Sequence, residues 1–374
     1  MKMKIPSAKP FFKEEEMEGI LGDVKSVLMS GRLILGPKAQ EFEELFARYI
    51  GVRHAISVNS CTTALEITLK YLEVKGKEVI VPTNTFVATL NSVIYAGGHP
   101  VLADINPESL CIDPQDLLKR ITKKTKGIIV VHIAGLVCPQ IEELKEICKE
   151  YNLFLIEDAA HAHGATLDEK KAGSFGDFGC FSFYPTKIMT TTIGGMITTN
   201  DDKLPSVAKS MRHHGQGEDL NQIVRLGNDW VMSEINAVLG LYQLKNLDSN
   251  IRRRNEIAKR YREGLKEVDS IKPFPVPKNI RHGYYKYPVL LKGDIDRADL
   301  IRVLKERYDI EVGGVYYPPC HLQPVFKRLF GYKEEMFPVA EEVLSKHICL
   351  PIYSQMKDIE VDYVLRCLKE EVKS

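Results

Sequence analysis

Short apolar segments alternate with amphipathic ones along the first half of the chain, and this alternation limits the possible folds more than any other feature. One amphipathic segment carries Ile141, Leu144 and Ile147 at helical spacing and separates two of the apolar segments. Strands that alternate with helices predict a mostly parallel sheet covered by helices on both faces. The strands are expected at residues 54–58, 79–81, 100–104, 127–133, 153–156, 178–183 and 195–199.

The two ends of the chain follow other patterns. Helices are expected within residues 12–49, and Ser233 is placed to cap a long helix. A second, highly charged helix is expected at residues 251–268, before a proline-rich linker. The remainder resembles a small α+β unit, with strands at 287–291 and 310–312 and helices at 297–307 and 359–372. We therefore predict an α/β fold with a large domain over residues 1–250 and a smaller C-terminal domain over residues 251–374.

Composition excludes several classes of function. The chain has 374 residues and a net charge of +1, which gives no basic surface for nucleic acid or an anionic membrane. Neither a membrane-spanning segment nor a secretory signal is expected from the distribution of apolar residues. The eight cysteines include no C-x-x-C pair, so we expect reduced residues of a cytoplasmic protein. No metal is expected, because His161, His163, His213 and His214 lack further ligands at suitable spacing.

Three polar features come directly after predicted strands. Lys187 follows residues 178–183, Asp158 follows residues 153–156, and the hydroxyl-rich residues 60–63 lead from a strand into a helix. Ligands bind at the carboxyl ends of the strands in such sheets, so we expect these features to converge. Each has a plainer explanation when taken singly, namely a surface lysine, a strand-end carboxylate or a helix cap.

Together, these features match the three chemical groups of pyridoxal phosphate. A desolvated lysine can form an imine with its aldehyde, and a helix start can bind its phosphate. A carboxylate beside the pyridine nitrogen keeps the ring protonated, which makes it an electron sink. We expect Lys187 to hold the cofactor and then to move a proton as a general base. No dinucleotide-binding or P-loop motif is present.

Several long stretches of the sequence resemble one family. The most specific are residues 157–165, 172–177 and 181–187, and residues 81–89, 232–234 and 321–324 also fit. From Gly36 to its last helix, the chain resembles the DegT-type nucleotide-sugar aminotransferases, a branch of the fold-type I pyridoxal-phosphate enzymes. This resemblance implies a homodimer in which each subunit completes the active site of the other.

The resemblance also implies a role for each matching residue. Lys187 and Asp158 take the roles given above. His161 would lie near the phenolic oxygen of the cofactor, and Phe86 would stack on its ring. The phosphate would be bound by Ser182, by Thr62 and Thr63, and by Asn228 of the partner subunit. Tyr184 and His321 fall in regions that the family uses around the sugar.

The chain departs from the family pattern at three places. Cys61 stands where the family often has glycine, and Ile193 stands where it often has an acidic residue. Residues 227–231 differ most, so either Asn228 or Asp229 could occupy the position of the family asparagine. We favour Asn228, because an aspartate would repel a phosphate.

The function expected from this resemblance is transamination. L-glutamate would aminate the cofactor, which would then aminate a keto group on a nucleotide-linked deoxysugar. A dehydratase or lyase on the same scaffold is one alternative, although Lys187 argues against it. A catalytically silent regulator is another, and the missing acidic residue at Ile193 leaves room for it. Ordinary amino-acid aminotransferases fit less well, because their motifs around the lysine differ.

Overall fold

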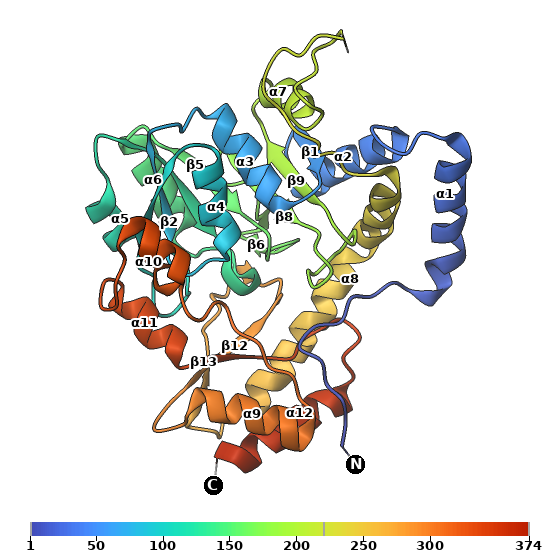
Figure 1. Ribbon diagram of the computed structural model, residues 1–374. Coiled ribbons are helices and arrows are strands. Elements are labelled where there is room, and N and C mark those ends of the chain that lie inside the picture. The colour runs from blue at the N-terminus through green and yellow to red at the C-terminus, as the bar shows by residue number, and fades with distance from the viewer. Residues whose placement is uncertain (1, 220, 373–374) are drawn as a thin grey trace.

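A seven-stranded sheet forms the centre of the molecule (Figure 1). The computed structural model describes residues 2–219 and 221–372. The strands run in the order β1-β9-β8-β5-β4-β2-β3, and only β9 is antiparallel to its neighbours. Their bounds are β1 (His54–Val58), β2 (Glu78–Pro82), β3 (His99–Ala103), β4 (Thr125–Val131), β5 (Phe154–Asp158), β8 (Phe178–Ser182) and β9 (Gly195–Thr199). The predicted α/β fold with a mostly parallel sheet is confirmed.

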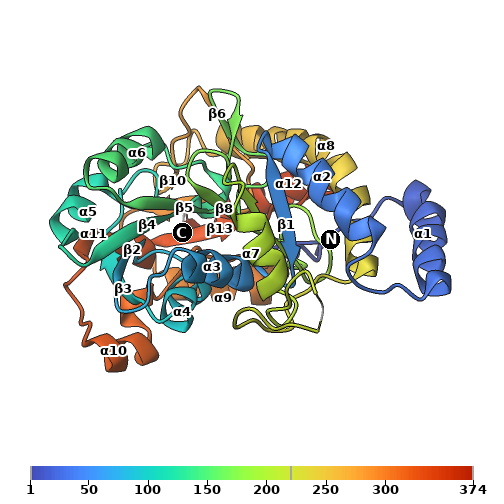
Figure 2. The same cartoon turned by 90° about the horizontal axis from the view of Figure 1, so that it is seen from above.

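Helices cover both faces of this sheet, as Figure 2 shows from above. α3 (Cys61–Tyr71) and α4 (Val87–Tyr95) lie on one face, and α6 (Ile141–Glu150) lies on the other. The central strands are therefore buried on both sides, which explains the runs of valine and isoleucine in β2 and β4. The other helices of this half are α1 (Met17–Ser30), α2 (Pro37–Ile50), α5 (Pro114–Arg120) and α7 (Leu204–Met211).

A second, three-stranded sheet lies in the C-terminal part of the chain. In it β12 (Tyr287–Leu291) pairs with β10 (Ile271–Pro273) and β13 (His347–Leu350), all antiparallel. The helices of this part are α9 (Arg297–Tyr308), α10 (Pro324–Phe330), α11 (Pro338–Ser345) and α12 (Asp358–Val372). A small third sheet contains β6 (Thr166–Leu167), β7 (Lys170–Lys171) and β11 (Ile280–Arg281). Three short 3-10 helices, η1 (Glu14–Glu16), η2 (Ile133–Gly135) and η3 (Cys320–Leu322), complete the elements.

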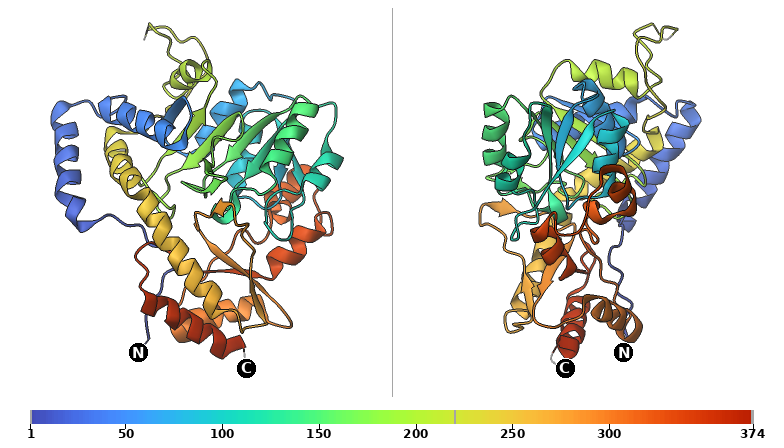
Figure 3. Two further views of the ribbon diagram at one scale, coloured as in Figure 1. Left: turned by 180° about the vertical axis from the view of Figure 1, so that it is seen from behind. Right: turned by 60° about the vertical axis from the view of Figure 1, so that its left-hand side comes forward.

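One long helix, α8 (Glu234–Gly264), joins the two parts, and Figure 3 shows it from behind. The prediction of two separate helices here was wrong. The buried stripe continues without a break through Leu247, Ile251, Arg254 and Ala258, so the charged run does not interrupt the helix. The expected cap is present, because the Ser233 side chain accepts a hydrogen bond from the Asn236 amide.

The predicted strand at residues 310–312 was also wrong. Ile310 forms an isolated bridge with Ile5, and Gly313 forms another with Cys349 of β13, but neither pairing extends into a ladder. Buried apolar side chains form two clusters, one around the large sheet and one in the C-terminal part. Ile251 belongs to the first and Ile257 to the second, although both lie on α8. The domain boundary at residue 250 stays a prediction.

Membrane-spanning character is absent from the described helices. Within residues 2–219 and 221–372, none combines the length and the apolar composition that crossing a bilayer requires.

Candidate active site

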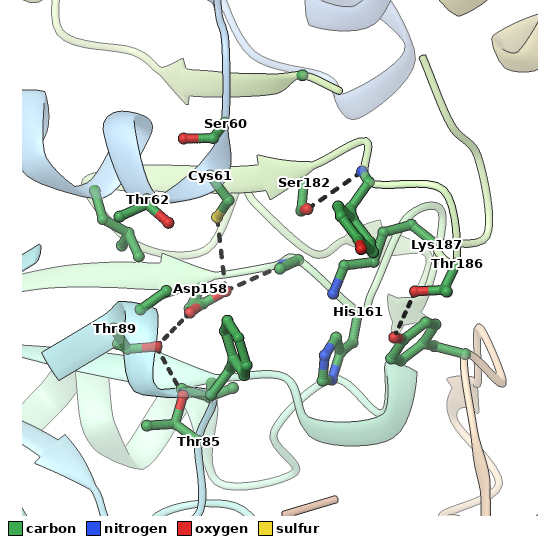
Figure 4. A pocket seen from close by; sticks show the side chains of 18 of the residues that line it. Ser60, Cys61, Thr62, Thr85, Thr89, Asp158, His161, Ser182, Thr186 and Lys187 are labelled. Atoms are coloured by element: carbon green, nitrogen blue, oxygen red, sulfur yellow. Dashed lines mark hydrogen bonds between the residues drawn. The ribbon is translucent and has the colours of Figure 1, made fainter. Parts of the chain in front are cut away.

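A cavity of about 490 Å³ lies where β5 and β8 end, at Asp158 and Ser182 (Figure 4). The parallel strands bring side chains from distant parts of the sequence to this edge, as expected for the carboxyl ends of such a sheet. Seven of the residues predicted for the site line the cavity, namely Thr62, Phe86, Asp158, His161, Ser182, Tyr184 and Lys187.

The Asp158 carboxylate is buried and accepts hydrogen bonds from three groups, of which the Cys61 thiol, at 3.9 Å from Oδ1, is the most distant. Thr89 Oγ1 donates to Oδ2 at 2.8 Å, and the Ala160 amide donates to Oδ1 at 3.2 Å. Thr85 extends this chain, with its hydroxyl 2.7 Å from that of Thr89. Burial raises the pKa of Asp158, and the bonds from Thr89 and Ala160 together with the Lys187 charge oppose that effect. The carboxylate is thus fixed in orientation and suited to pair with a protonated group in the cavity.

The Lys187 amine enters the same cavity from a turn after β8, and lies close to the His161 ring in Figure 4. The turn is closed by the Lys187 amide, which donates to the Tyr184 carbonyl at 2.9 Å. Burial lowers the pKa of Lys187 to about 8, while the negative charge of Asp158 acts in the opposite direction. A substantial fraction of the amine is therefore neutral and nucleophilic near neutral pH.

The start of α3 forms the opposite wall. The Ser60 hydroxyl accepts from the Thr63 amide at 3.1 Å, but helix geometry leaves the amides of Cys61 and Thr62 without intrahelical acceptors. A Cβ on Gly195 would lie 2.3 Å from the Ser60 carbonyl carbon, so only glycine lets β9 pass this close to the helix start. Free amides, the helix dipole and the Ser182 hydroxyl suit a phosphate group.

Aromatic rings close the cavity around His161. The Tyr285 ring lies 4.3 Å from the His161 ring, and the Lys187 amine lies 4.6 Å from the centre of the Tyr285 ring. Tyr316 Oη is 2.8 Å from His161 Nε2. Burial, followed by the charge of Lys187, lowers the pKa of His161 well below its usual value, so the imidazole is neutral. Phe86 is 56% exposed and is therefore free to contact a ligand.

Three of the predicted residues do not line the cavity. His321 is fully buried, with Nδ1 2.7 Å from Thr83 Oγ1 and Nε2 3.0 Å from a Glu341 oxygen. Thr63 is engaged in hydrogen bonds around the helix start. Asn228 is exposed, and its side-chain oxygen accepts from the Asp229 amide. Their roles stay predictions, and we do not include His321 in the proposed site.

The sequence analysis missed other residues that line the cavity. Thr85 and Thr89 lie within the matching stretch 81–89, and their four-residue spacing could have indicated a shared polar function. Tyr285 and Tyr316 come from the C-terminal part, in segments with no distinctive motif. Nothing local in the sequence indicates that these rings return to the large sheet.

A family model matches a part of the sequence that includes all the residues of the cavity. The model of the DegT/DnrJ/EryC1/StrS aminotransferase family matches residues 14–369. The chain belongs to this family. It is accordingly a sugar aminotransferase of the α/β type described above, and the resemblance found in the sequence is confirmed.

Individual known proteins are similar to the chain along nearly its full length. The spore coat polysaccharide biosynthesis protein SpsC of Bacillus subtilis is 36% identical, over 99% of this chain and 97% of that protein. The GDP-perosamine synthase of Caulobacter vibrioides is 35% identical, over 98% of each chain. The solved PMP form of the putative sugar aminotransferase Spr1654 from Streptococcus pneumoniae superposes with a TM-score of 0.92 and is 30% identical, over 99% of this chain and 98% of that chain.

Proposed function

We propose that the chain transfers an amino group from L-glutamate to a keto group of a nucleotide-linked deoxysugar, with pyridoxal phosphate bound covalently to Lys187. The observation that carries this proposal is the presence of the Lys187 amine and the Asp158 carboxylate in one cavity beside a free helix start. The names of two relatives, GDP-perosamine synthase and dTDP-3-amino-3,4,6-trideoxy-alpha-D-glucose transaminase, support a nucleotide-linked sugar as substrate.

The residues of the cavity fit pyridoxal phosphate group by group. Asp158 would accept from the protonated ring nitrogen, since its orientation is already fixed by Thr89 and Ala160. The amides of Cys61 and Thr62 and the Ser182 hydroxyl would bind the phosphate. Phe86 would cover one face of the ring. When bound, the cofactor supplies an electron sink next to the carbon that exchanges its amino group.

Lys187 would then carry out the proton transfers. The same low pKa that makes the amine a nucleophile allows it to accept and return a proton near neutral pH. The aromatic side chains Tyr184, Tyr285 and Tyr316 wall the cavity and would limit the access of water to this step.

We further propose that the enzyme acts in the cytoplasm as a homodimer with shared active sites. Asn228 of the partner subunit would reach the phosphate from outside the cavity of a single chain. The exposed position of Asn228, and the lack of any cavity contact within its own chain among the described residues, support this arrangement.

A test of the function starts with the purified protein loaded with pyridoxal phosphate. The bound cofactor should give a visible absorbance band that shifts when L-glutamate is added, and Lys187→Ala should abolish the band while the protein stays folded. Lys286→Ala is a matched control, because Lys286 also lies against the Tyr285 ring but does not line the cavity.

The substrate is then found with a panel of nucleotide-linked keto sugars, assayed with the glutamate-treated enzyme. One or more of them should be aminated and should restore the original band. An absorbance band that no amino donor shifts would contradict transamination and would favour a silent cofactor-binding protein.

A further inference from the structure

The loop that carries Lys187 closes on a short turn formed by residues 190–193. The Phe183 carbonyl, directly after β8, accepts from the Thr191 amide at 3.0 Å and from the Thr190 hydroxyl at 2.9 Å. Between the end of β8 and the start of β9 the structure describes every residue, and this stretch contains no helix or strand. The position of Lys187 therefore depends on how the turn at the base of its loop is held.

The turn contains a residue in an unfavourable backbone conformation. Thr192 lies in the left-handed region, with a φ of 69°. A β-branched side chain makes this region costly, and such conformations persist only where the surrounding structure holds them. Within the turn, the Thr192 amide donates to the Thr190 hydroxyl at 2.9 Å. Contacts from outside the turn must supply the rest.

Asn236, in the first helical turn of α8, supplies such contacts. Its Nδ2 donates to the Ile193 carbonyl at 2.7 Å and to the Thr192 hydroxyl at 3.0 Å, and the Thr191 carbonyl is a third acceptor within reach. Its Oδ1 accepts from the Ser233 hydroxyl. A reversed amide would place its oxygen against two carbonyl oxygens, so these neighbours fix its orientation.

Gln243, two helical turns further along α8, holds the same loop at a second point. Its Oε1 accepts from the Thr190 amide at 3.3 Å. Between this anchor and Lys187, the side chains of Ile188 and Met189 are buried. The loop is thus held by α8 on one side and by the core on the other.

The position of the loop decides how well the Lys187 amine is shielded from water. The amine lies in the cavity (Figure 4). Burial has the largest effect on its pKa and lowers it to about 8, whereas Asp158 on β5 and Cys61 at the start of α3 act in the opposite direction. The pKa values of the neighbouring His161 and His163 are lowered by burial, so both rings are neutral. A displaced loop would admit water and weaken the effect of burial on Lys187.

We propose that Asn236, supported by Gln243, is a positioning residue for Lys187: it holds the strained turn 190–193 and thereby fixes the loop that places the amine in the cavity. The catalytic consequence rests on the proposed function, because it takes Lys187 as the residue that binds the cofactor. The effect on the position of the amine does not, and it can be measured without cofactor.

The position of the amine is tested through its reactivity. Asn236→Leu removes the amide donors at nearly unchanged side-chain volume. The pH midpoint at which an amine-specific reagent labels Lys187, followed by peptide mass spectrometry, should rise from about 8 towards the ordinary value of 10.5. Asn246→Leu is the matched control, because Asn246 also lies on α8 but donates to Glu16 and not to the turn. Equal midpoints in Asn236→Leu and the control would overturn the proposal.

Two further variants test the connection through the turn. Gln243→Leu removes the second anchor and should move the labelling midpoint in the same direction. Thr192→Gly, added to Asn236→Leu, should return the midpoint part of the way to about 8, because glycine adopts a positive φ without strain. An unchanged midpoint in Gln243→Leu, or a double variant with the midpoint of Asn236→Leu alone, would contradict the proposal.

The catalytic consequence is measured as the rate at which the visible band appears after pyridoxal phosphate is added. Below the pKa, each unit by which the pKa rises reduces the neutral amine about tenfold. Asn236→Leu should therefore form the band about tenfold more slowly at pH 7 for each such unit, and the difference should disappear at high pH. Equal rates at pH 7, or slowing by one factor at every pH, would overturn the proposal. If the unmodified protein gives no band, the proposed function fails while the labelling result still stands.

Discussion

The charges of Lys187 and Asp158 depend on each other within the cavity. Burial disfavours both charged forms, and each charge partly offsets the penalty on the other. One interaction, between Lys187 and Asp158, therefore affects the pKa values of both residues. These pKa values set the amounts of neutral lysine, which can attack an aldehyde, and of ionised carboxylate, which can pair with the ring nitrogen. The chemistry of the site depends on the two residues as a pair.

Replacing Asp158 with asparagine should make Lys187 a weaker base. Asp158 raises the pKa of Lys187, so its removal should move that pKa below the present value of about 8. Because the neutral amine exists above the pKa, the rate at which an amine-specific reagent labels Lys187 in the cofactor-free protein should rise at lower pH than in the unmodified protein. Peptide mass spectrometry over a pH series measures this rate.

Asp362→Asn serves as the control for that experiment, because Asp362 lies on α12 and outside the cavity. A labelling midpoint in Asp158→Asn at or above that of the control would contradict the proposed coupling.

Most residues of the candidate site could be predicted because they lie directly after strands. Lys187, Asp158 and Thr62 are positioned by the sheet itself, so the order of strands and polar residues in the sequence was sufficient to bring them together. Tyr285 depends instead on how the neighbouring segment packs against Ala134 and Gly135. Tyr316 depends on how the C-terminal part packs against the residues that follow β2. That packing involves contacts between residues more than 200 positions apart, such as Asn84 and Tyr316, which no local pattern encodes.

At the scale of elements, α2 and α8 are joined by one carboxylate. Glu234 is the first residue of α8 and is buried, and its oxygens accept from the amides of Gly36, Lys38 and Ala39 at 3.0, 2.8 and 3.0 Å. These amides belong to the start of α2, where backbone donors have no intrahelical partner. Glu234 thus caps one helix while it begins another.

Glu234→Ala should lower the free energy of unfolding by about 3 kcal/mol, because it leaves buried amides unsatisfied. Glu234→Gln keeps one acceptor oxygen and should cost about half as much. Urea unfolding followed by circular dichroism measures both. Glu256→Ala on the same helix is the control, since Glu256 pairs with Arg253 at the surface and should change stability by less than about 0.5 kcal/mol. Equal losses in Glu234→Ala and this control would exclude the capping role.

Two features of the secondary structure, the continuity of α8 and the direction of β9, could not be predicted from the sequence for physical reasons. The charged run from Arg252 to Arg254 is typical of the solvated face of a helix, but Arg254 is buried and donates to the carbonyls of Tyr284 and Ile352. A charged residue therefore continues the buried stripe of α8. β9 runs antiparallel to both of its neighbours, β1 and β8. The pattern of apolar residues predicts a strand but does not indicate the direction in which that strand runs.

At the scale of the whole molecule, the cavity is walled by both parts of the chain. Asp158, Ser182 and Lys187 belong to the large sheet region, whereas Tyr285 and Tyr316 come from the C-terminal part. A ligand in the cavity would contact both and would therefore stabilise their association as well as its own site.

Pyridoxal phosphate should accordingly raise the melting temperature of the protein. At a concentration about 100 times its dissociation constant, the gain is about 2.7 kcal/mol, which corresponds to a few degrees for a chain of this size. Lys187→Ala should reduce the rise, because only the non-covalent contacts remain. Differential scanning calorimetry with inorganic phosphate in place of the cofactor is the control. A rise of the same size with inorganic phosphate would show that the cofactor ring contributes nothing.

The continuity of α8 limits how this enzyme can open and close. A helix of 31 residues is roughly 46 Å long, and bending it sharply would break backbone hydrogen bonds along its length. The length of α8 thus sets the distance between the two parts of the chain that it joins. We therefore expect substrate entry and product release to involve movement of loops at the rim of the cavity, without a sharp bend in α8.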